Sequence, residues 1–346
     1  MNTNVTVNAP AVKTPGSGAV VSGTENDAPA FYIRNIPIHG RLFLAPMAGF
    51  SDGPYRLLCR RLGAAFAFTE FISTDGVRQG RREVWQRLRF RDQERPVILQ
   101  LFGNNPDVML YSARLIEEMQ PDVIDINMGC SVRAIAHKGS GAGMLRDPLR
   151  TGRIMERLVR HLHVPVTAKI RLGWDAASRN YLEMAHVLES SGVAMISVHG
   201  RTRAQGYGGQ ADWEAIGEIK ARSNVPVLGN GDVTSRSMAL ERRRQTGVDG
   251  ILIGRGAMGN PWIFQSDRQD GQYRPDRRAV LDTMQAHLRD MQQWYGERGL
   301  MLFRKHAARY LDRIETPAAT RRRLLTGTDP EEFVDICLDL RDAPGC

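Results

Sequence analysis

A cysteine in a glycine-rich segment is the first residue of this 346-residue chain whose setting suggests chemistry. Cys130 ends the apolar run VIDINMGC (123–130), and Gly139, Gly141 and Gly143 follow it closely. A thiol with an ordinary pKa of about 8.5 is largely protonated near neutral pH, so it can donate a proton, whereas the thiolate form can act as a nucleophile. The sequence alone leaves both roles open. The glycines predict a loop that can move.

A lysine inside another apolar run is the second unusual residue. Lys169 lies in PVTAKIRLG (165–173), where an ammonium group is costly unless an opposite charge or an anionic ligand lies next to it. Other polar residues also stand at or near the ends of apolar runs. They are Gln100, Asn127, Arg171, His199, Arg201, Asn230, Asp232 and Arg255. Any single one could merely satisfy a buried backbone group, but ten such residues together indicate a shared site.

Glycines recur at the ends of the last two apolar runs, in GNGD (229–232) and IGRGA (253–257). Glycine allows a backbone amide to approach a ligand closely, and amides at the start of a helix bind phosphate. Arg255 would add a positive charge. Two such turns in neighbouring positions predict a ligand that carries a phosphate group.

The elements that must position these residues follow a simple alternation between Arg41 and Pro261. Short apolar runs alternate with longer amphipathic segments, which indicates repeated βα units and a parallel sheet. The runs are 41–49, 65–73, 96–103, 123–130, 165–173, 194–201, 226–232 and 250–259. The predicted helices are 54–63, 106–120, 148–162, 180–191, 212–223 and 235–245, with Asp212 and Ser235 as N-caps.

Eight strands over about 220 residues predict an α/β protein with a (β/α)8 TIM barrel. The active site of such a barrel lies at the carboxyl ends of its strands, where the polar residues described above would converge. A doubly wound open sheet is the weaker alternative, because no GxGxxG turn follows the first run.

The chain changes character after Pro261, where strand-like runs stop. Helices are predicted at 276–296, 300–313, 317–325 and 329–341. We therefore expect a disordered tail at residues 1–30, a barrel domain at 31–266 and a small C-terminal helical domain at 267–346.

Charge and cysteine usage limit the class of protein. The formal net charge is +9. Residues 1–30 contribute about −1 and residues 267–346 about 0, which leaves about +10 on residues 31–266 and favours a polyanionic partner. The four cysteines form no CxxC pair and no metal-ligand spacing, so we expect a cytoplasmic protein without a metal. No run of about 18 apolar residues predicts a membrane span.

Taken together, these motifs resemble those of the tRNA-dihydrouridine synthases, and most closely the bacterial B-type branch of that family. The resemblance covers about residues 31–340. The matching segments are LAPMAGFSD (44–52), QLFG (100–103), DINMGC (125–130), GSGAGMLRDP (139–148), KIRLGW (169–174), VHGRTRAQGYGG (198–209), GNGD (229–232), IGRGAMGNPWIF (253–264) and FRKHAARYL (303–311).

The resemblance implies an FMN cofactor in the mouth of the barrel. Pro46, Met47 and Ala48 would line its ring system, and Gln100 and Lys169 would contact the polar edge of the ring. His199 would lie near the flavin or its tail. The residues implied for the ribityl chain and the phosphate are Asn230, Gly231, Asp232, Gly254 and Arg255.

The resemblance also implies the reaction. NADPH, or else NADH, would reduce FMN, and the reduced flavin would give a hydride to C6 of a uridine in the tRNA D-loop while Cys130 protonates C5. The glycine-rich loop would close over the extruded base. The family usually has a proline after this cysteine, but here the residue is Ser131, which leaves the backbone freer.

The protein is expected to be a monomer that binds tRNA with residues of both domains. The implied substrate contacts are Asn127, Lys138, Arg171, Arg201, Arg304, Lys305 and Arg309. The run Arg321 to Arg323 would add phosphate contacts, although such a run is more often only a solvated face. His137 and Lys138 share the loop of Cys130 and could modulate the thiol or lie in solvent.

Two other classes of function remain at this point. Another FMN barrel enzyme, acting on a small molecule, would share the phosphate site but would need neither the basic barrel nor the helical domain. A non-catalytic RNA-binding protein with the same fold would bind no flavin. A metal-dependent barrel hydrolase is disfavoured, because no cluster of histidine and carboxylate residues stands at the strand ends.

Overall fold

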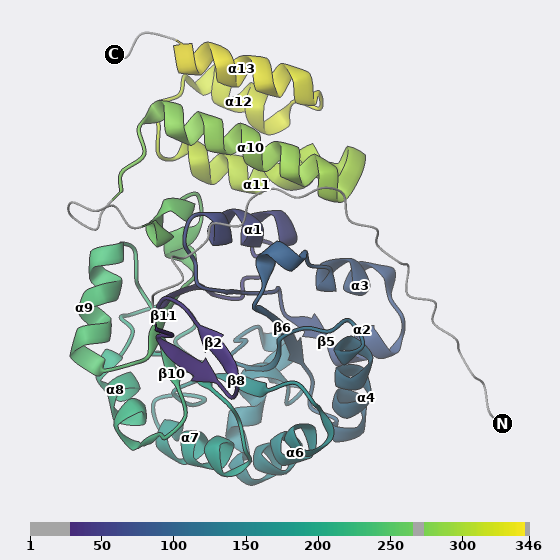
Figure 1. Cartoon of the computed structure of the whole chain (residues 1–346), viewed down its shortest axis with the longest axis vertical. Coiled ribbons are helices and arrows are strands. Elements are labelled where there is room, and N and C mark those ends of the chain that lie inside the picture. Colours follow the sequence, from purple (N-terminus) through teal and green to yellow (C-terminus); the bar gives the residue numbers. More distant parts are fainter. Residues whose placement is uncertain (1–27, 266–272, 343–346) are drawn as a thin grey trace, which may run out of the picture.

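The computed structural model describes residues 28–265 and 273–342, and these form a closed parallel barrel with a group of helices beside it (Figure 1). The tail predicted for residues 1–30 lies outside the described residues except for 28–30, and so does the domain boundary predicted at 266 and 267. No helix in the described part of the chain is long and apolar enough to cross a membrane.

Eight strand positions close the barrel, in the order in which the sequence predicts them. The strands are β3 (Leu42–Leu44), β4 (Ala67–Phe68), β5 (Ile72–Ser73), β6 (Val97–Phe102), β7 (Val123–Met128), β8 (Val166–Arg171), β9 (Ile196–His199), β10 (Val227–Asn230) and β11 (Gly250–Ile253). Each pairs in parallel with its neighbours, and pairing of β4 with both β3 and β6 closes the ring. The predicted TIM barrel is confirmed.

The second predicted strand, 65–73, is broken in the structure. β4 pairs with β3 and β6, whereas β5 pairs with β6 alone, and residues 69–71 lie between them. The break turns Glu70 toward the end of β3, where its carboxylate accepts a hydrogen bond of 2.5 Å from the amide of Gly49. The interruption therefore fixes the loop that follows β3.

Helices cover the outside of the barrel. They are α1 (Gly53–Arg61), α2 (Thr74–Arg78), α3 (Arg82–Leu88), α4 (Pro106–Glu117), α5 (Arg133–Ala136), α6 (Pro148–His161), α7 (Tyr181–Ser190), α8 (Trp213–Arg222) and α9 (Arg236–Thr246). Short 3-10 turns are η1 (Asp92–Glu94), η2 (Gly141–Arg146), η3 (Arg255–Ala257) and η4 (Pro261–Phe264). The predicted N-caps are confirmed, because Asp212 accepts from the amide of Ala215 and Ser235 from that of Met238. The helices α2, α3 and α5 were not predicted.

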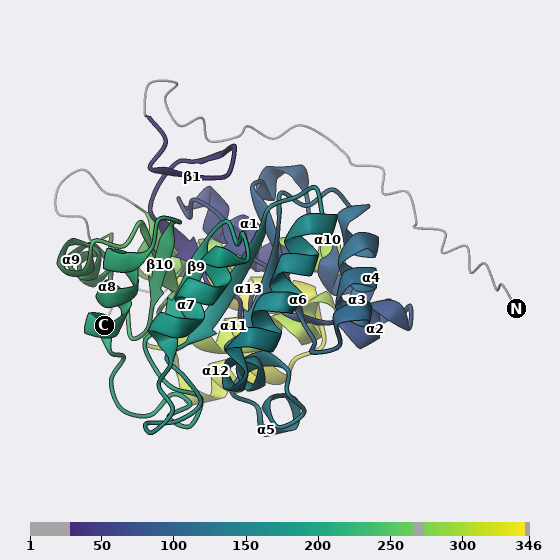
Figure 2. The same cartoon turned by 90° about the horizontal axis from the view of Figure 1, so that it is seen from below.

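A β-hairpin that the sequence did not predict closes the amino end of the barrel. Its strands β1 (Phe31–Ile33) and β2 (Ile36–Ile38) are antiparallel, and Phe31 packs edge-on against Phe43 of β3 at 5.9 Å. The hairpin and α5 lie at opposite ends of the barrel (Figure 2). The mouth of the barrel is therefore the end that carries α5.

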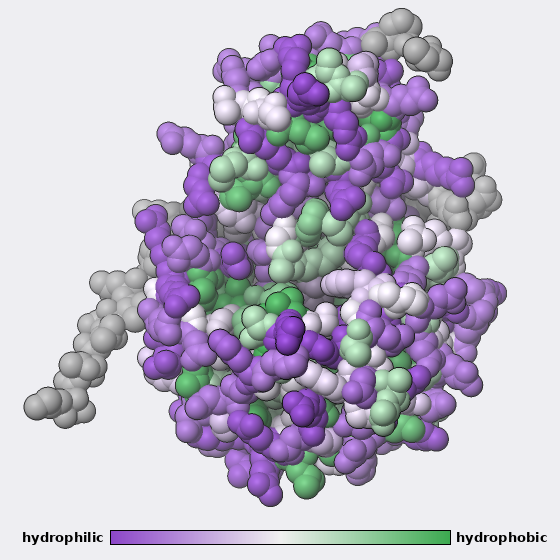
Figure 3. Space-filling view, turned by 180° about the vertical axis from the view of Figure 1, so that it is seen from behind, coloured by the Kyte–Doolittle hydropathy of each residue, from purple (hydrophilic) through white to green (hydrophobic). Residues whose placement is uncertain are grey.

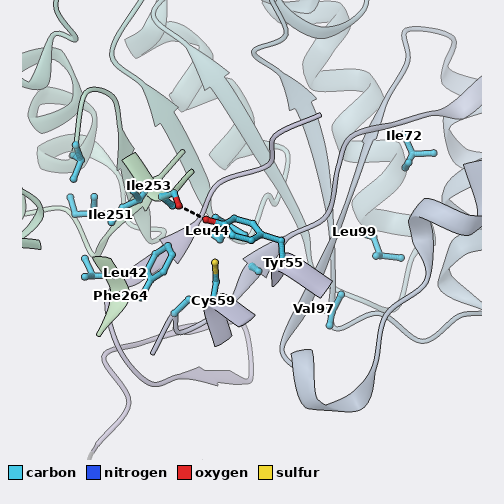
Figure 4. Close-up of a cluster of buried hydrophobic side chains, with 14 of the residues drawn as sticks. Leu42, Leu44, Tyr55, Cys59, Ile72, Val97, Leu99, Ile251, Ile253 and Phe264 are labelled. Carbon is cyan, nitrogen blue, oxygen red and sulfur yellow. Dashed lines mark hydrogen bonds between the residues drawn. The ribbon is translucent and has the colours of Figure 1, made fainter. Parts of the chain in front are cut away.

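The C-terminal helices form a separate layer against α1. They are α10 (Arg277–Tyr295), α11 (Gly299–Leu311), α12 (Ala318–Thr326) and α13 (Pro330–Asp342), with the turn η5 (Gly296–Arg298) between the first two. The contact with α1 is close, since a Cβ atom on Gly53 would lie 2.6 Å from the Trp294 ring. On its other face α1 places Tyr55 and Cys59 against β3 and β11 in the core (Figure 4).

Candidate active site

A cavity of about 630 Å³ opens at the carboxyl ends of the strands. Its wall contains most of the residues implied for the cofactor: Pro46, Met47, Ala48, Lys169, His199, Asn230, Gly231, Asp232, Gly254 and Arg255. Cys130, Asn127 and Arg171 line it as well. The face of the molecule opposite the hairpin is hollowed between the barrel and the helical layer, with apolar surface toward the middle and hydrophilic surface around it (Figure 3).

Cys130 lies at this wall because Asn127 holds its backbone. The side-chain oxygen of Asn127 accepts hydrogen bonds from the amides of Gly129 at 3.0 Å and Cys130 at 2.8 Å. The thiol is only partly exposed, and burial raises its pKa, although the amide of Val132 and the charge of Arg171 act in the opposite direction. The geometry thus presents a protonated thiol to the cavity.

The glycines after Cys130 serve close packing. A Cβ atom on Gly141 would lie 2.9 Å from the Cβ of Cys130, and one on Gly143 would lie 2.3 Å from the carbonyl oxygen of Ala136. Residues 140–145 are buried, and the amide of Ala142 donates to the carbonyl of Cys130. The structure therefore shows a packed turn of glycines against the cysteine, and the mobility expected for the loop stays a prediction.

A buried hydrogen-bond chain supports Asn127 from inside the barrel. Its amide donates to the side-chain oxygen of Gln100 at 2.8 Å, and the Gln100 amide donates to Asp125 at 2.7 Å. Thr167 donates to the other Asp125 oxygen at 2.6 Å. Burial raises the pKa of Asp125 to about 6. Gln100, implied as a flavin contact, is not among the residues that line the cavity and reaches it through Asn127.

The sequence analysis did not select Asp125, although a signal was present. The residue lies two positions before Asn127 in an otherwise apolar strand, so both side chains point to the same face. A carboxylate in such a strand needs a partner as much as Lys169 does.

Lys169 has few partners for a buried cation. Its ammonium group donates to the side-chain oxygen of Asn230 at 3.1 Å, and no ion pair is present for it among the residues of the described ranges. Burial and the charge of Arg171 lower its pKa to about 7, against an opposing effect of Asp125. The predicted need for a partner is thus not met by a carboxylate in contact with the ammonium.

His199 is neutral in this setting. Burial lowers its pKa far below the ordinary value, and the charges of Lys169, Arg171 and Arg201 add to the effect. A neutral imidazole can donate or accept one hydrogen bond without adding a further positive charge to the cavity.

The two arginines implied as substrate contacts hold loops together. Arg171 donates to the carbonyls of Gly129, Thr202 and Gly206, each at 2.8 Å. Arg201, with 1 % exposure, pairs with Asp232 at 2.7 Å and does not line the cavity. Because its donors are used within the protein, a direct contact of Arg201 with substrate is not supported.

The end of the cavity near β10 and β11 combines glycines with the guanidinium group of Arg255. Arg255 is half exposed, and its guanidinium is 3.3 Å from Asp232 and lies over the ring of Tyr207, 4.6 Å from the centroid. Asp232 adopts a left-handed conformation with φ of 57°. Tyr207 was not singled out in the sequence analysis, although it stands in the segment VHGRTRAQGYGG (198–209).

The remaining predicted substrate contacts lie away from the cavity wall. Lys138 is exposed on the loop after α5. In α11, Arg304 donates to the carbonyls of Thr326 and Gly327, Lys305 is 3.2 Å from Asp52, and Arg309 is 3.5 Å from Asp312. Ion pairs also bind Arg321 to Asp312 and Arg323 to Glu332, each at 2.7 Å. These pairs reduce the charge that the helical layer offers to a polyanion.

One group among the described residues has the composition of a metal site. Asp52, His287 and His306 place ligand atoms within 4.8 Å of one another, all buried. The group was not predicted because its members are far apart in sequence. The Lys305 ammonium lies beside the same Asp52 oxygen that contacts His306, and this charge opposes a metal ion. The expectation of no metal stays a prediction.

Comparison with known proteins gives consistent matches over most of the chain. The sequence model of the family described as "Dihydrouridine synthase (Dus)" matches residues 43–343. The chain is 40 % identical over 279 residues to "tRNA-dihydrouridine synthase B" of Pseudomonas aeruginosa, covering 78 % of this chain and 83 % of that protein. It is 35 % identical over 312 residues to the protein of the same name from Pasteurella multocida, covering 87 % and 92 %.

Solved structures agree at the level of the fold. A 2-naphthoyl-CoA reductase complex aligns with a TM-score of 0.51 at 10 % identity, covering 67 % of this chain and 50 % of that one. At this identity the similarity extends to the barrel architecture alone.

Proposed function

Since the chain belongs to the dihydrouridine synthase family, we propose that it reduces the C5=C6 bond of uridines in the D-loop of tRNA, using FMN and NADPH. The observation that carries the proposal is the shared cavity: a thiol kept protonated by burial and an ammonium without a carboxylate partner line the same wall. Uridine reduction needs a proton donor and a hydride source in one site. The cavity wall provides the proton donor, and the cavity has room for a hydride source.

The residues present fit a flavin. Ala45, Pro46 and Met47 form an apolar wall suited to a flat ring system, and the cavity volume is large enough for a ligand of this class. Lys169 would meet the electronegative edge of the ring, which answers its missing partner. A bound flavin would supply hydride transfer, a chemistry that amino-acid side chains do not provide.

The phosphate end would lie near β10 and β11. Gly231 and Gly254 line the cavity there, and Arg255 stands at its edge with half of its surface exposed. A Cβ atom on Gly231 would lie 2.4 Å from Ala211, so the backbone at this point is in close contact and needs glycine. Amides and a guanidinium together form a suitable phosphate site.

The protein's own part in the reaction is to hold and move a proton. Reduction adds a hydride at C6 and a proton at C5, and the Cys130 thiol is the proton donor that faces the cavity. Once it has given up its proton, the thiolate is stabilised by the charge of Arg171 and regains a proton from solvent. Asn127 keeps the cysteine backbone in place throughout.

The polar residues of the cavity wall also determine where positive charge meets a bound ligand. Lys169, with a pKa of about 7, adopts the charged form when an electronegative group approaches it, because opposite charges favour ionisation. His199 stays neutral and so does not compete for that group. The cavity wall therefore offers the positive charge of Lys169 to that group and the neutral thiol of Cys130 as an acid.

Transfer RNA is supported as the substrate by the names of the relatives and by charge. The surplus of about +10 on residues 31–266 attracts a polyanion, and the hollow face between barrel and helical layer gives it space. A helical domain from about residue 267 would share the binding. Such an enzyme would work in the cytoplasm, and it is proposed to act as a monomer.

The test is nucleotide-resolved mapping of dihydrouridine in an unmodified tRNA incubated with NADPH, FMN and the protein. We expect dihydrouridine at defined D-loop positions with the wild type. Cys130→Ala should form it at least about 100-fold more slowly, the usual effect of losing a general acid. A wild-type protein that binds FMN and tRNA but forms no dihydrouridine would contradict the proposal and favour a small-molecule substrate.

A further inference from the structure

A cluster of cations surrounds one tryptophan beside the loop of Cys130, and the function proposed above leaves it without a role. Trp174 follows β8, Arg146 ends η2, and Arg203 lies in the loop after β9. The guanidinium carbons of Arg146 and Arg203 lie 5.0 Å and 4.5 Å from the indole centroid. His137 meets the same ring edge-on at 5.5 Å. We call these four residues the Trp174 cluster.

The cluster joins three loops of the barrel mouth. The amide of Arg203 donates to the carbonyl of Gly173 at 2.9 Å, and the amide of Ala204 donates to that of Trp174 at 2.8 Å. Gly173 adopts φ of 145°, where a Cβ atom would lie 2.4 Å from the carbonyl oxygen of Ser178. Because backbone bonds fix the ring, its position relative to the cavity is fixed as well.

The charges of this rim are not neutralised by ion pairs. Arg146 and Arg203 form none within the part of the chain that the structure describes, and neither do Arg133 and Lys138 on the same loops. The three loops 131–147, 172–178 and 202–210 contain these four basic residues and only two acidic ones, Asp147 and Asp175.

Both carboxylates are used in local turns. Asp147 accepts from the amide of Arg150 at 3.0 Å and caps α6, and Asp175 accepts from the amides of Ala177 and Ser178. Three arginines of the helical layer differ, since Arg309, Arg321 and Arg323 have carboxylate partners. The four basic residues of the rim beside Cys130 therefore stay without a carboxylate partner in the described part of the chain.

We propose that the Trp174 cluster binds the phosphate backbone of the tRNA strand next to the target uridine. This inference rests on the proposed function, and it gives a role to Trp174, Arg146 and Arg203, for which the sequence analysis named none. Stacking on an indole ring fixes the plane of a guanidinium while its N–H groups stay free at the edge, an arrangement suited to phosphate oxygens. The ring is already covered by guanidinium groups, so it supports them and offers less surface to a base.

The position of the cluster explains why the strand would pass here. A base that reaches Cys130 must leave its stack, and its own phosphates then lie at the rim of the cavity. The cluster shares its loops with Cys130, through residues 131–147, and with Arg171, whose side chain is bonded to Thr202. Holding the backbone at this rim would orient the extruded base over the thiol.

The test is the salt dependence of tRNA affinity. The variant Arg146→Gln/Arg203→Gln removes both stacked cations, and Arg160→Gln/Arg222→Gln removes two cations from the last turns of α6 and α8, at the other end of the barrel. Dissociation constants for one unmodified tRNA are measured for both variants and the wild type between about 50 and 300 mM KCl.

We expect the rim variant to bind about tenfold more weakly than the control at about 100 mM KCl. Its slope of log Kd against log salt should fall by about 1.4, since each single-stranded phosphate contact contributes about 0.7. The rate at which NADPH reduces the flavin in the absence of tRNA should be the same in the rim variant as in the wild type. A rim variant with the affinity and slope of the control would overturn the inference.

The variant Trp174→Leu sharpens the test, because it removes the indole ring on which the guanidinium groups stack and keeps the charges of Arg146 and Arg203. It should weaken binding several-fold with an unchanged slope. A wild type that binds tRNA but forms no dihydrouridine would defeat the proposed function, while the binding comparison would still decide the role of the cluster.

Discussion

The mouth of the barrel and the junction between α1 and the helical layer both bury ionisable groups that are far apart in sequence. At the junction, Asp52 accepts from the amide of Tyr55 at 3.1 Å and from His306 at 3.0 Å, and Lys305 lies 3.2 Å away. His287 is hydrogen-bonded to Tyr310, and aromatic rings surround it. At the mouth, Lys169 has a single side-chain acceptor and borders a cavity of about 630 Å³.

The difference shows that burial and an unusual residue type do not by themselves identify a functional site. The junction turns its opposite charges toward one another, and so it joins two parts of the fold. The mouth places positive charges around a cavity. This arrangement is costly, and an anionic or electronegative ligand would reduce the cost. The two regions should therefore respond in opposite ways to mutation.

The largest effect is expected at the mouth for Lys169→Met. The variant removes the proposed partner of the flavin ring, so we expect FMN affinity and the rate of dihydrouridine formation to fall by about 100-fold or more, the scale of losing a charged hydrogen bond of about 3 kcal/mol. The free energy of unfolding of the protein without flavin should not fall, because a desolvated charge is removed. Flavin fluorescence titration and urea unfolding measure the two effects.

Lys138→Met is the matched control for that variant, since Lys138 is exposed and outside the cavity wall. Its FMN affinity should equal that of the wild type. An equal loss of FMN affinity in both variants would mean that Lys169 in the cavity wall is no more important for flavin binding than Lys138 outside it.

At the junction, Asp52→Asn should destabilise the fold and spare the chemistry. An asparagine can still cap α1, but the ammonium of Lys305 and the ring of His306 lose their carboxylate partner, and we expect about 3 kcal/mol of lost stability. Urea unfolding should show this loss, whereas Asp282→Asn, on an exposed face of α10, should change little. A large fall in FMN affinity without a loss of stability would show that the junction belongs to the site.

The pH dependence of FMN affinity tests Lys169 without mutation. The pKa of this lysine is about 7 in the free protein, and binding requires its charged form. Binding therefore takes up a proton above pH 7, and Kd should rise about tenfold per pH unit between about pH 7.5 and 9, a linkage that Lys169→Met should lack. A flat profile in the wild type would mean that the ammonium does not contact the cofactor.

The smallest effect is expected for Lys305→Gln. This lysine has 32 % exposure and Asp52 keeps His306 as a partner, so the loss of stability should stay below about 1 kcal/mol. tRNA affinity should also stay nearly unchanged, because the charge is already paired. A tenfold weaker tRNA complex would restore the original prediction that Lys305 contacts phosphate.

Periodicity in the sequence predicted most of the fold. Eight apolar runs became the eight strand positions, and the four C-terminal helices lie close to their predicted bounds. The hairpin at Phe31–Ile38 was missed because its strands have three residues each, one of them containing Pro37. Its stability comes from packing on Phe43, a tertiary contact that no local pattern reveals.

The candidate site was predictable where one residue type conflicts with its surroundings. Cys130 and Lys169 stood out in this way, and both line the cavity. Gln100 and Arg201 were predicted to contact ligands, but the structure directs their polar atoms to Asp125 and Asp232. Such pairings join residues 25 and 31 positions apart, and their geometry depends on strand register.

The central claim is that Cys130 protonates a uridine from the wall of the cavity that holds the flavin. Its most direct test follows the oxidation of pre-reduced enzyme by unmodified tRNA in single turnover without oxygen, for wild type and Cys130→Ala. We predict that the wild type and Cys130→Ala bind tRNA and accept electrons from NADPH equally well. Oxidation by tRNA should be about 100-fold or more slower in Cys130→Ala. Equal rates in the two proteins, or no oxidation of the wild type by bound tRNA, would contradict the account.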